Sequence, residues 1–167
     1  MGKLKLILSF AFITLCSSFC FGKQISIQVV QHCGKSETVF EQSYLIEDGL
    51  LEGFFEQGHI VTNSPAAVSF SDSDDESVWT HSLGDAYEGA AEYFAQIDVF
   101  FNPEEVSASG KLILNKVDWS VSSVRSGKKI KTSTIGNINK NVDTKDLKVL
   151  SSNLCVEINK AIISNKA

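Results

Sequence analysis

Apolar and polar residues follow two different periods in the first third of the chain. They partly alternate from Gln24 to Gln31, which predicts a strand with one buried face. From Phe40 to Gln57 apolar residues recur every three or four positions, which predicts a helix that ends at Gly58. Gly49 and Gly53 lie on one side of this helix, so we expect a neighbouring strand or helix to approach it closely there.

The rest of the chain divides into further elements by the same two periods. We expect strands at residues 59–63, 97–101, 111–124 and 130–138, and helices at residues 79–96 and from Asp143 or Thr144 to about Ile163. Between them we expect an acidic loop at 71–77, a turn at 102–105 and a hairpin turn at 125–128. Apolar residues change parity between Leu114 and Val117, which predicts a β-bulge or a bend.

The predicted order of elements is β-α-β-α-β-β-β-α. Two alternating units followed by a hairpin and a helix predict an α/β fold (α+β mixed) in which helices pack on a mixed β-sheet. Residues 23–167 have the length of a single domain, and the hydrophobic share of 43% is typical of a protein with a folded core. We therefore expect one α/β domain over residues 23–167.

Residues 1–22 have the pattern of a cleavable signal peptide. Lys3 and Lys5 precede an apolar run from Leu6 to Leu15, and small or mildly polar residues follow as far as Gly22. This run is too short to span a bilayer, which takes about 20 apolar residues. A bulky residue precedes each cysteine of the segment, whereas lipid attachment needs a small one, so we expect a soluble periplasmic or secreted protein with no membrane span.

Charge is distributed unevenly along the chain. Residues 23–105 carry 2 basic and 16 acidic residues, whereas residues 106–167 carry 11 basic and 4 acidic ones. Either the two halves neutralise each other across one fold, or a polarised surface steers association with a charged partner. The basic residues of the predicted hairpin form a candidate partner surface, made of Arg125, Lys128, Lys129 and Lys131. Net acidity and export both argue against nucleic-acid binding.

Cleavage of the signal peptide would leave two cysteines, Cys33 and Cys155. In an oxidising compartment they could form one disulfide, and the loop that it closed would be long enough for a large entropic stabilisation. The alternative is a pair of buried free thiols, which behave as small hydrophobic side chains.

Motifs of catalysis and metal binding are absent from the sequence. His32, His59 and His81 have none of the spacings of zinc sites, and the acidic residues at 72–76 lack the glycine and glutamate of a calcium-binding EF-hand loop. GxSxG, GxGxxG and GxxxxGK[ST] do not occur. We therefore expect no catalytic residue, no metal and no cofactor.

The order of elements also carries a resemblance. A first strand leads into a helix that ends in glycine before a short strand, here residues 24–31, Tyr44–Gly58 and 59–63. A second helix then runs into the strand sequence Ala95–Phe100, and a hairpin with the turn Ser126–Lys128 precedes the closing helix. This arrangement resembles a group of small bacterial envelope α/β domains typified by LpoB and by the amino-terminal domain of TolB. The resemblance implies an envelope location and action through a binding surface, and it assigns no site residue to this chain.

These observations favour one function over two alternatives. The leading hypothesis is an exported, soluble, non-enzymatic domain that binds another cell-envelope protein. The first alternative is a periplasmic hydrolase that uses Cys33 or the acidic run. The second is a self-assembling structural envelope protein, in which acidic and basic halves of neighbouring copies meet.

Overall fold

The computed structural model describes residues 22–34, 36–106, 112–136, 138 and 143–165. Its elements, in chain order, are β1 (Gln24–His32), α2 (Glu41–Glu56), β2 (Ile60–Asn63), β3 (Ala67–Ser69), α3 (Asp72–Glu88), β4 (Tyr93–Val106), β5 (Leu112–Ser123), β6 (Lys128–Ile135) and α4 (Thr144–Ser164). The strands form one sheet in the order β2-β1-β4-β5-β6, with β3 also paired to β1. Strand β1 runs parallel to β2, β3 and β4, whereas β4, β5 and β6 are antiparallel neighbours. The predicted mixed sheet is confirmed.

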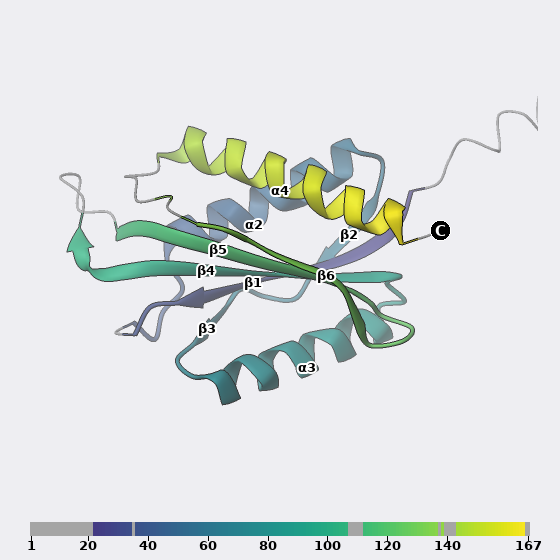
Figure 1. The fold of residues 1–167 in the computed structure, drawn as a ribbon, viewed down its shortest axis with the longest axis horizontal. Coiled ribbons are helices and arrows are strands. Elements are labelled where there is room, and N and C mark those ends of the chain that lie inside the picture. Colours follow the sequence, from purple (N-terminus) through teal and green to yellow (C-terminus); the bar gives the residue numbers. More distant parts are fainter. Residues whose placement is uncertain (1–21, 35, 107–111, 137, 139–142, 166–167) are drawn as a thin grey trace, which may run out of the picture.

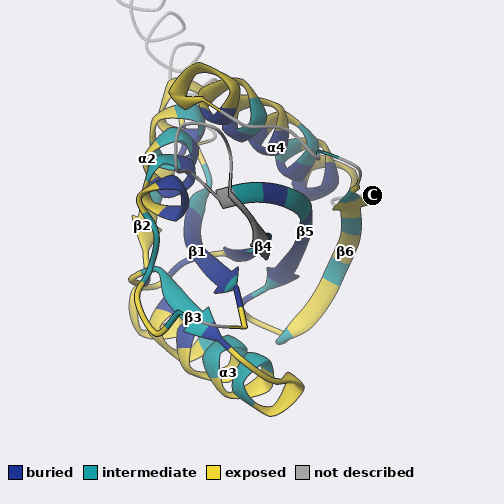
Figure 2. Cartoon of the chain, turned by 90° about the vertical axis from the view of Figure 1, so that its left-hand side faces the viewer, coloured by how far each residue is buried: buried dark blue, intermediate teal, exposed yellow. Residues whose placement is uncertain are grey.

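Helices cover both faces of the sheet, and the two faces differ in chemistry. Helices α2 and α4 lie on one face and α3 lies on the other (Figure 1). The core lies on the face of α2 and α4, where Ile25, Ile27 and Val29, the alternating apolar residues of the predicted first strand, are fully buried. Figure 2 shows β1 and β5 largely buried, whereas β6 is exposed at the edge.

The face toward α3 is largely polar. Its strands place buried glutamine and serine side chains there, each at most 5% exposed: Ser26, Gln28, Gln96, Ser120 and Ser122. A small apolar cluster of Ala86, Ala91, Phe94 and Val124, with Trp79 and Leu83 packed against it, joins α3 to this face. Asp98 and Asp118, on the same face of the sheet, lie outside this apolar cluster.

Helices α2 and α4 approach each other closely, as the two glycines of α2 predict. A Cβ atom at Gly49 would lie 2.8 Å from the Cβ of Ser151, and one at Gly53 would lie 2.8 Å from the Sγ of Cys155. The Oγ of Ser151 donates a hydrogen bond of 3.2 Å to the carbonyl oxygen of Ile46 in α2. The predicted close approach is confirmed, and the neighbouring element is α4.

Four predictions for the middle of the chain are wrong. Residues 72–77 of the predicted acidic loop are the first turns of α3, because Ser71 caps the helix and the nearby aspartates favour its positive N-terminal end. The helix predicted at 79–96 therefore ends at Glu88, and the strand predicted to begin at Ile97 begins at Tyr93, where it pairs with β1. The turn predicted at 102–105 lies within β4, and the short strand β3 was not predicted.

Bulges interrupt the two antiparallel pairs of strands. Phe100 pairs with Lys116 and Phe101 pairs with Leu114, so Asn115 is an extra residue in β5 and the predicted bulge is confirmed. A second bulge lies in β6, where Ile130 is the extra residue between Lys129 and Lys131. Residues two apart in a strand normally share a face. Because of the extra residue, Lys129 and Lys131 instead lie on opposite faces of the sheet.

The ends of the chain complete the description. The predicted signal peptide lies outside the described residues, except for Gly22. Among the described residues, no helix has both the length and the apolar character needed to cross a membrane. Helix α4 begins as predicted, with Asp143 and Asp146 forming a reciprocal capping box.

Candidate functional site

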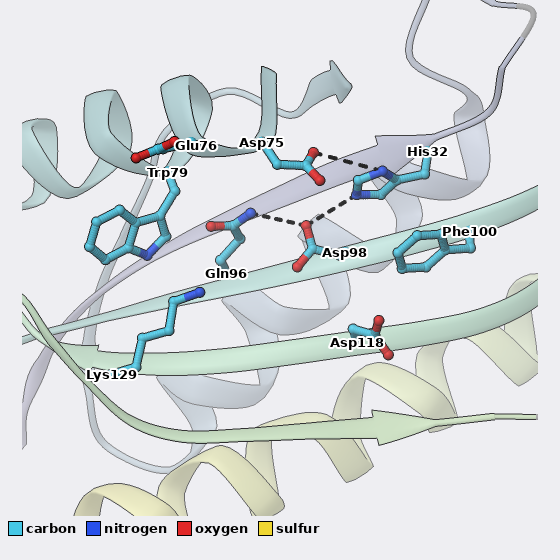
Figure 3. Close-up of a pocket in the computed structure, with 9 residues that line it drawn as sticks. All are labelled: His32, Asp75, Glu76, Trp79, Gln96, Asp98, Phe100, Asp118 and Lys129. Atoms are coloured by element: carbon cyan, nitrogen blue, oxygen red, sulfur yellow. Dashed lines mark hydrogen bonds and ion pairs between the residues drawn. The ribbon is translucent and has the colours of Figure 1, made fainter. Parts of the chain in front are cut away.

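A pocket of about 460 Å³ opens on the polar face of the sheet, beside α3. Its lining comes from β1, α3, β4, β5 and β6, and consists of His32, Asp75, Glu76, Trp79, Gln96, Asp98, Phe100, Asp118 and Lys129 (Figure 3). A volume of this size lies within the range of small-ligand sites. We refer to these nine residues as the sheet pocket.

Strand parity and register bring these side chains together. Gln96, Asp98 and Phe100 alternate along β4 and therefore point to one face. In the register of the sheet, His32 of β1 is the partner of Phe100 and Asp118 of β5 is the partner of Asp98. Two carboxylates that lie directly opposite each other repel unless other groups compensate them.

A lysine pairs with Asp118, and a histidine and a glutamine contact Asp98. The Nε2 of His32 lies 3.2 Å from Oδ1 of Asp98, and its Nδ1 lies 3.8 Å from Oδ1 of Asp75. The Nζ of Lys116 lies 2.7 Å from Oδ2 of Asp118. The Nε2 of Gln96 adds a hydrogen bond of 3.0 Å to Oδ1 of Asp98.

Aromatic rings of the sheet pocket contact cations of the same chain. The His32 ring stacks on Phe100, with centroids 4.2 Å apart and an interplanar angle of 10°. On the same ring, the Nζ of Lys116 lies 4.0 Å from the centroid of Phe100. The Nζ of Lys129 lies 5.5 Å from the centroid of Trp79, within the range of a cation–π interaction.

Several polar atoms of the sheet pocket lack a hydrogen-bond partner among the described residues. They are Oδ1 of Asp75, Nε1 of Trp79, Oε1 of Gln96 and Oδ1 of Asp118, all buried as atoms. The 3.8 Å between Asp75 and His32 is too long for a hydrogen bond. Leaving a buried polar atom unpaired costs about 1–3 kcal/mol, so these four atoms are available for hydrogen bonds to water or to a bound molecule.

The predicted partner surface does not form one patch around the pocket. Lys129 lines the sheet pocket, whereas the Nζ of Lys131 lies 5.5 Å from the centroid of Trp119, a core residue on the opposite face. The bulge at Ile130 explains this separation. Arg125 and Lys128 are exposed at the hairpin and do not line the sheet pocket.

The cysteines and the other histidines do not line the sheet pocket. Cys33 and Cys155 are both free and buried in the structure, which matches the second of the two alternatives for them. Burial raises the pKa of the Cys155 thiol to about 12. His59 packs against Phe54, and burial lowers its pKa. In the part of the chain that the structure describes, no group of histidine, cysteine and acidic side chains could hold a metal ion.

Most residues that line the sheet pocket were not predicted from the sequence, although polar residues at alternate positions of two strands indicate them. In β4 the parity opposite to Ala95 and Ile97 carries Gln96 and Asp98, and in β5 the parity opposite to Trp119 carries Asp118 and the next serine. Such polar residues in central strands of a covered sheet are unusual.

Comparison with solved structures defines the class of the chain as a small mixed α/β domain. The PelC dodecamer from Paraburkholderia phytofirmans is 12% identical, the match covers 80% of this chain and 84% of that one, and the TM-score is 0.50. The LpoB C-terminal domain from Salmonella enterica is 11% identical, with 71% and 84% covered and a TM-score of 0.43. TolB from Acinetobacter baumannii is 12% identical, with 84% and 28% covered and a TM-score of 0.42. LpoB and TolB, which the sequence resembles, are thus among the matches, and the similarity is one of fold alone.

Sequence comparison then gives the family. The chain belongs to a family described as "Uncharacterised protein", whose model matches residues 24–166. No curated protein matches the chain.

Proposed function

We propose that this chain is an exported, non-enzymatic domain that binds another cell-envelope protein, and that the sheet pocket is the centre of its binding surface. The observation that carries the proposal is the set of four unpartnered buried polar atoms in one pocket. A partner that enters the pocket would satisfy these atoms and remove their cost to the folded state. The signal-peptide pattern of residues 1–22 supports a periplasmic or secreted location.

The chemistry of the lining favours binding over catalysis. None of the nine residues that line the sheet pocket has a hydroxyl or a thiol that could act as a nucleophile. Both ring nitrogens of His32 face carboxylates, and the ring is stacked on Phe100. This placement connects β1 to β4 through the contact of His32 with Asp98.

Photo-crosslinking in the native cell tests the proposal. Glu76 is exposed at the rim of the sheet pocket, and Glu56 is exposed on α2, on the other face of the sheet. A photo-crosslinking residue replaces one or the other, and the products are identified by mass spectrometry. We expect one envelope protein to be crosslinked from position 76 and not from position 56.

Each other outcome of this experiment overturns part of the proposal. The absence of a product from position 76, or equal products from both positions, would refute a binding surface at the sheet pocket. A product that contains only two copies of this chain would refute a separate partner and support self-assembly. A hydrolytic activity of the purified protein that Asp98→Asn abolishes would refute the non-enzymatic role.

A further inference from the structure

We infer that the sheet pocket receives a cationic side chain of the partner, and that an arginine guanidinium is the group that fits it. This inference rests on the proposed function and specifies the chemistry of the partner. It follows from three properties of the pocket: the unpartnered acceptors, the balance of charge and the aromatic rings.

The first property is the unpartnered oxygen of Gln96. This side chain is 5% exposed, and its Nε2 donates to the carboxylate of Asp98 over 3.0 Å. Because a carboxylate accepts and does not donate, this bond fixes which end of the amide faces Asp98. The other end, Oε1, has no partner among the described residues and points into the pocket, away from Asp98 (Figure 3). This buried acceptor is available to a donor from outside the chain.

Two more acceptors share the pocket with Gln96. Among the buried atoms of the described residues, Oδ1 of Asp75 on α3 and Oδ1 of Asp118 on β5 also lack hydrogen bonds, and Nε1 of Trp79 is the one such donor of the lining. Within this set of buried atoms, acceptors outnumber the donor by three to one. A guanidinium has five N–H donors in a planar fork and no acceptor, so one such group can donate toward several elements at once.

The charge of the pocket has the sign that a cation requires. Its lining includes four carboxylates, those of Asp75, Glu76, Asp98 and Asp118, against the single ammonium of Lys129. Lys116 neutralises part of Asp118 through an ion pair of 2.7 Å. Counting both lysines, the acidic groups still exceed the basic ones, apart from His32. An anionic ligand would meet net repulsion in this pocket.

The aromatic rings of the pocket also suit a guanidinium group. Trp79 already has the Nζ of Lys129 at 5.5 Å from its centroid, so this ring contacts a cation in the chain itself. Guanidinium groups stack on tryptophan more readily than ammonium groups do, because they are planar and more weakly hydrated. A partner's arginine would therefore compete with Lys129 for the face of Trp79.

Because of this competition, a substitution of Lys129 distinguishes a cationic occupant from an acidic partner: the two predict opposite changes in binding. If the pocket takes a cation, Lys129→Gln removes a competing like charge and strengthens binding. If Lys129 instead attracts an acidic partner, the same substitution weakens binding. Lys129 is exposed, so the variant is expected to fold normally.

The test is an NMR titration of the purified protein with Nα-acetyl-arginine amide, in which the guanidinium is the only charge. The matched control is Nα-acetyl-citrulline amide, a neutral molecule of nearly the same shape. Two indole N–H signals report on binding: that of Trp79 in the pocket, and that of Trp119, which is 2% exposed on the other face. We expect the arginine probe to shift the Trp79 signal and leave the Trp119 signal in place, and we expect no shift with citrulline.

Substitutions in the chain measure how much single residues contribute to binding of the arginine probe. We expect Asp118→Asn to weaken binding of the arginine probe by about tenfold or more, since it removes a charge-assisted hydrogen bond. We expect Lys129→Gln to strengthen binding by about two- to fivefold, since exposed charges interact weakly. Glu88→Gln is the control, because Glu88 is exposed near the end of α3 and does not line the pocket.

The outcomes separate this inference from the proposed function. Equal shifts with arginine and citrulline, or weaker binding by Lys129→Gln, would overturn the cationic occupant. If either occurs while position 76 still crosslinks one envelope protein, the proposed function stands and only the arginine is refuted. A selective arginine shift without any crosslinked partner would support the pocket chemistry and count against a protein partner.

Discussion

A methyl group added at Gly53 would force helices α2 and α4 apart, whereas the same group added at Gly84 would meet nothing. The Cβ of an alanine at position 53 would lie 2.8 Å from Sγ of Cys155 and 3.4 Å from its Cβ. At Gly84, in the interior of α3, no atom outside the local helix lies within 4 Å of such a Cβ. The two substitutions are chemically identical, so they isolate the effect of packing.

The expected magnitudes follow from two opposing effects. Replacing glycine by alanine inside a helix stabilises it by about 1 kcal/mol. Inserting a methyl group into a closely packed interface costs about 1–3 kcal/mol. We therefore expect Gly84→Ala to raise the free energy of unfolding by about 1 kcal/mol, and Gly53→Ala to change it by about 0 to −2 kcal/mol. The difference between the two variants, about 1–3 kcal/mol, is the packing effect, because the helix preference cancels.

Urea denaturation measures both free energies, and an unchanged slope shows that the comparison is valid. The clash should depend on the sulfur atom, so Gly53→Ala should be less harmful in a Cys155→Ala background, and a double-mutant cycle gives the coupling. If Gly53→Ala stabilises the protein as much as Gly84→Ala does, the close packing of α2 on α4 is refuted. The same conclusion follows if the coupling to Cys155 is zero.

Three further predictions concern single groups. Burial raises the pKa of Cys155 to about 12, so at pH 8 a thiol reagent should modify this residue only after the protein unfolds. Rapid labelling of Cys155 in the native protein would contradict its burial. Burial lowers the pKa of His59 below 6.5, so the unfolded chain binds a proton at higher pH than the folded chain does. The free energy of unfolding should therefore fall as the pH drops through 6.5. In a pH series of urea midpoints, His59→Gln should reduce this pH dependence. Asp143→Ala removes the cap of α4 and should lower the free energy of unfolding by about 1 kcal/mol in the same assay, whereas Asp143→Asn should be nearly neutral.

The sequence predicts best those elements whose apolar residues recur on one side. Strand β1, helices α2 and α4 and the bulge in β5 are all visible as periodic apolar residues, because in each case the opposite side is polar. Helix α3 is misplaced because its first turn is acidic, and a cluster of carboxylates looks the same in a loop and at a helix start. Strand β3 depends on pairing of Ala67 with Val30, a contact that no local pattern contains.

The sheet pocket is harder to predict than the fold. Its residues come from five elements, and strand order decides which of them meet. Gln96 and Asp98 look like the solvated side of an amphipathic strand, whereas the structure covers them in part with α3. Of the basic residues of the hairpin, Lys129 alone lines the pocket. Polar residues in central strands are the feature of the sequence that corresponds to the pocket-bearing face.

The division of the sheet into an apolar face and a polar face has a consequence for how such a protein can evolve. The apolar side chains that pack under α2 and α4 determine whether the chain folds, and exchanges there disturb the core. The polar side chains opposite, such as Asp98 and Asp118, contribute little to that core, so exchanges among them can alter recognition while the scaffold persists. A descendant of this chain could therefore acquire a different partner through a few substitutions on alternate positions of two neighbouring strands.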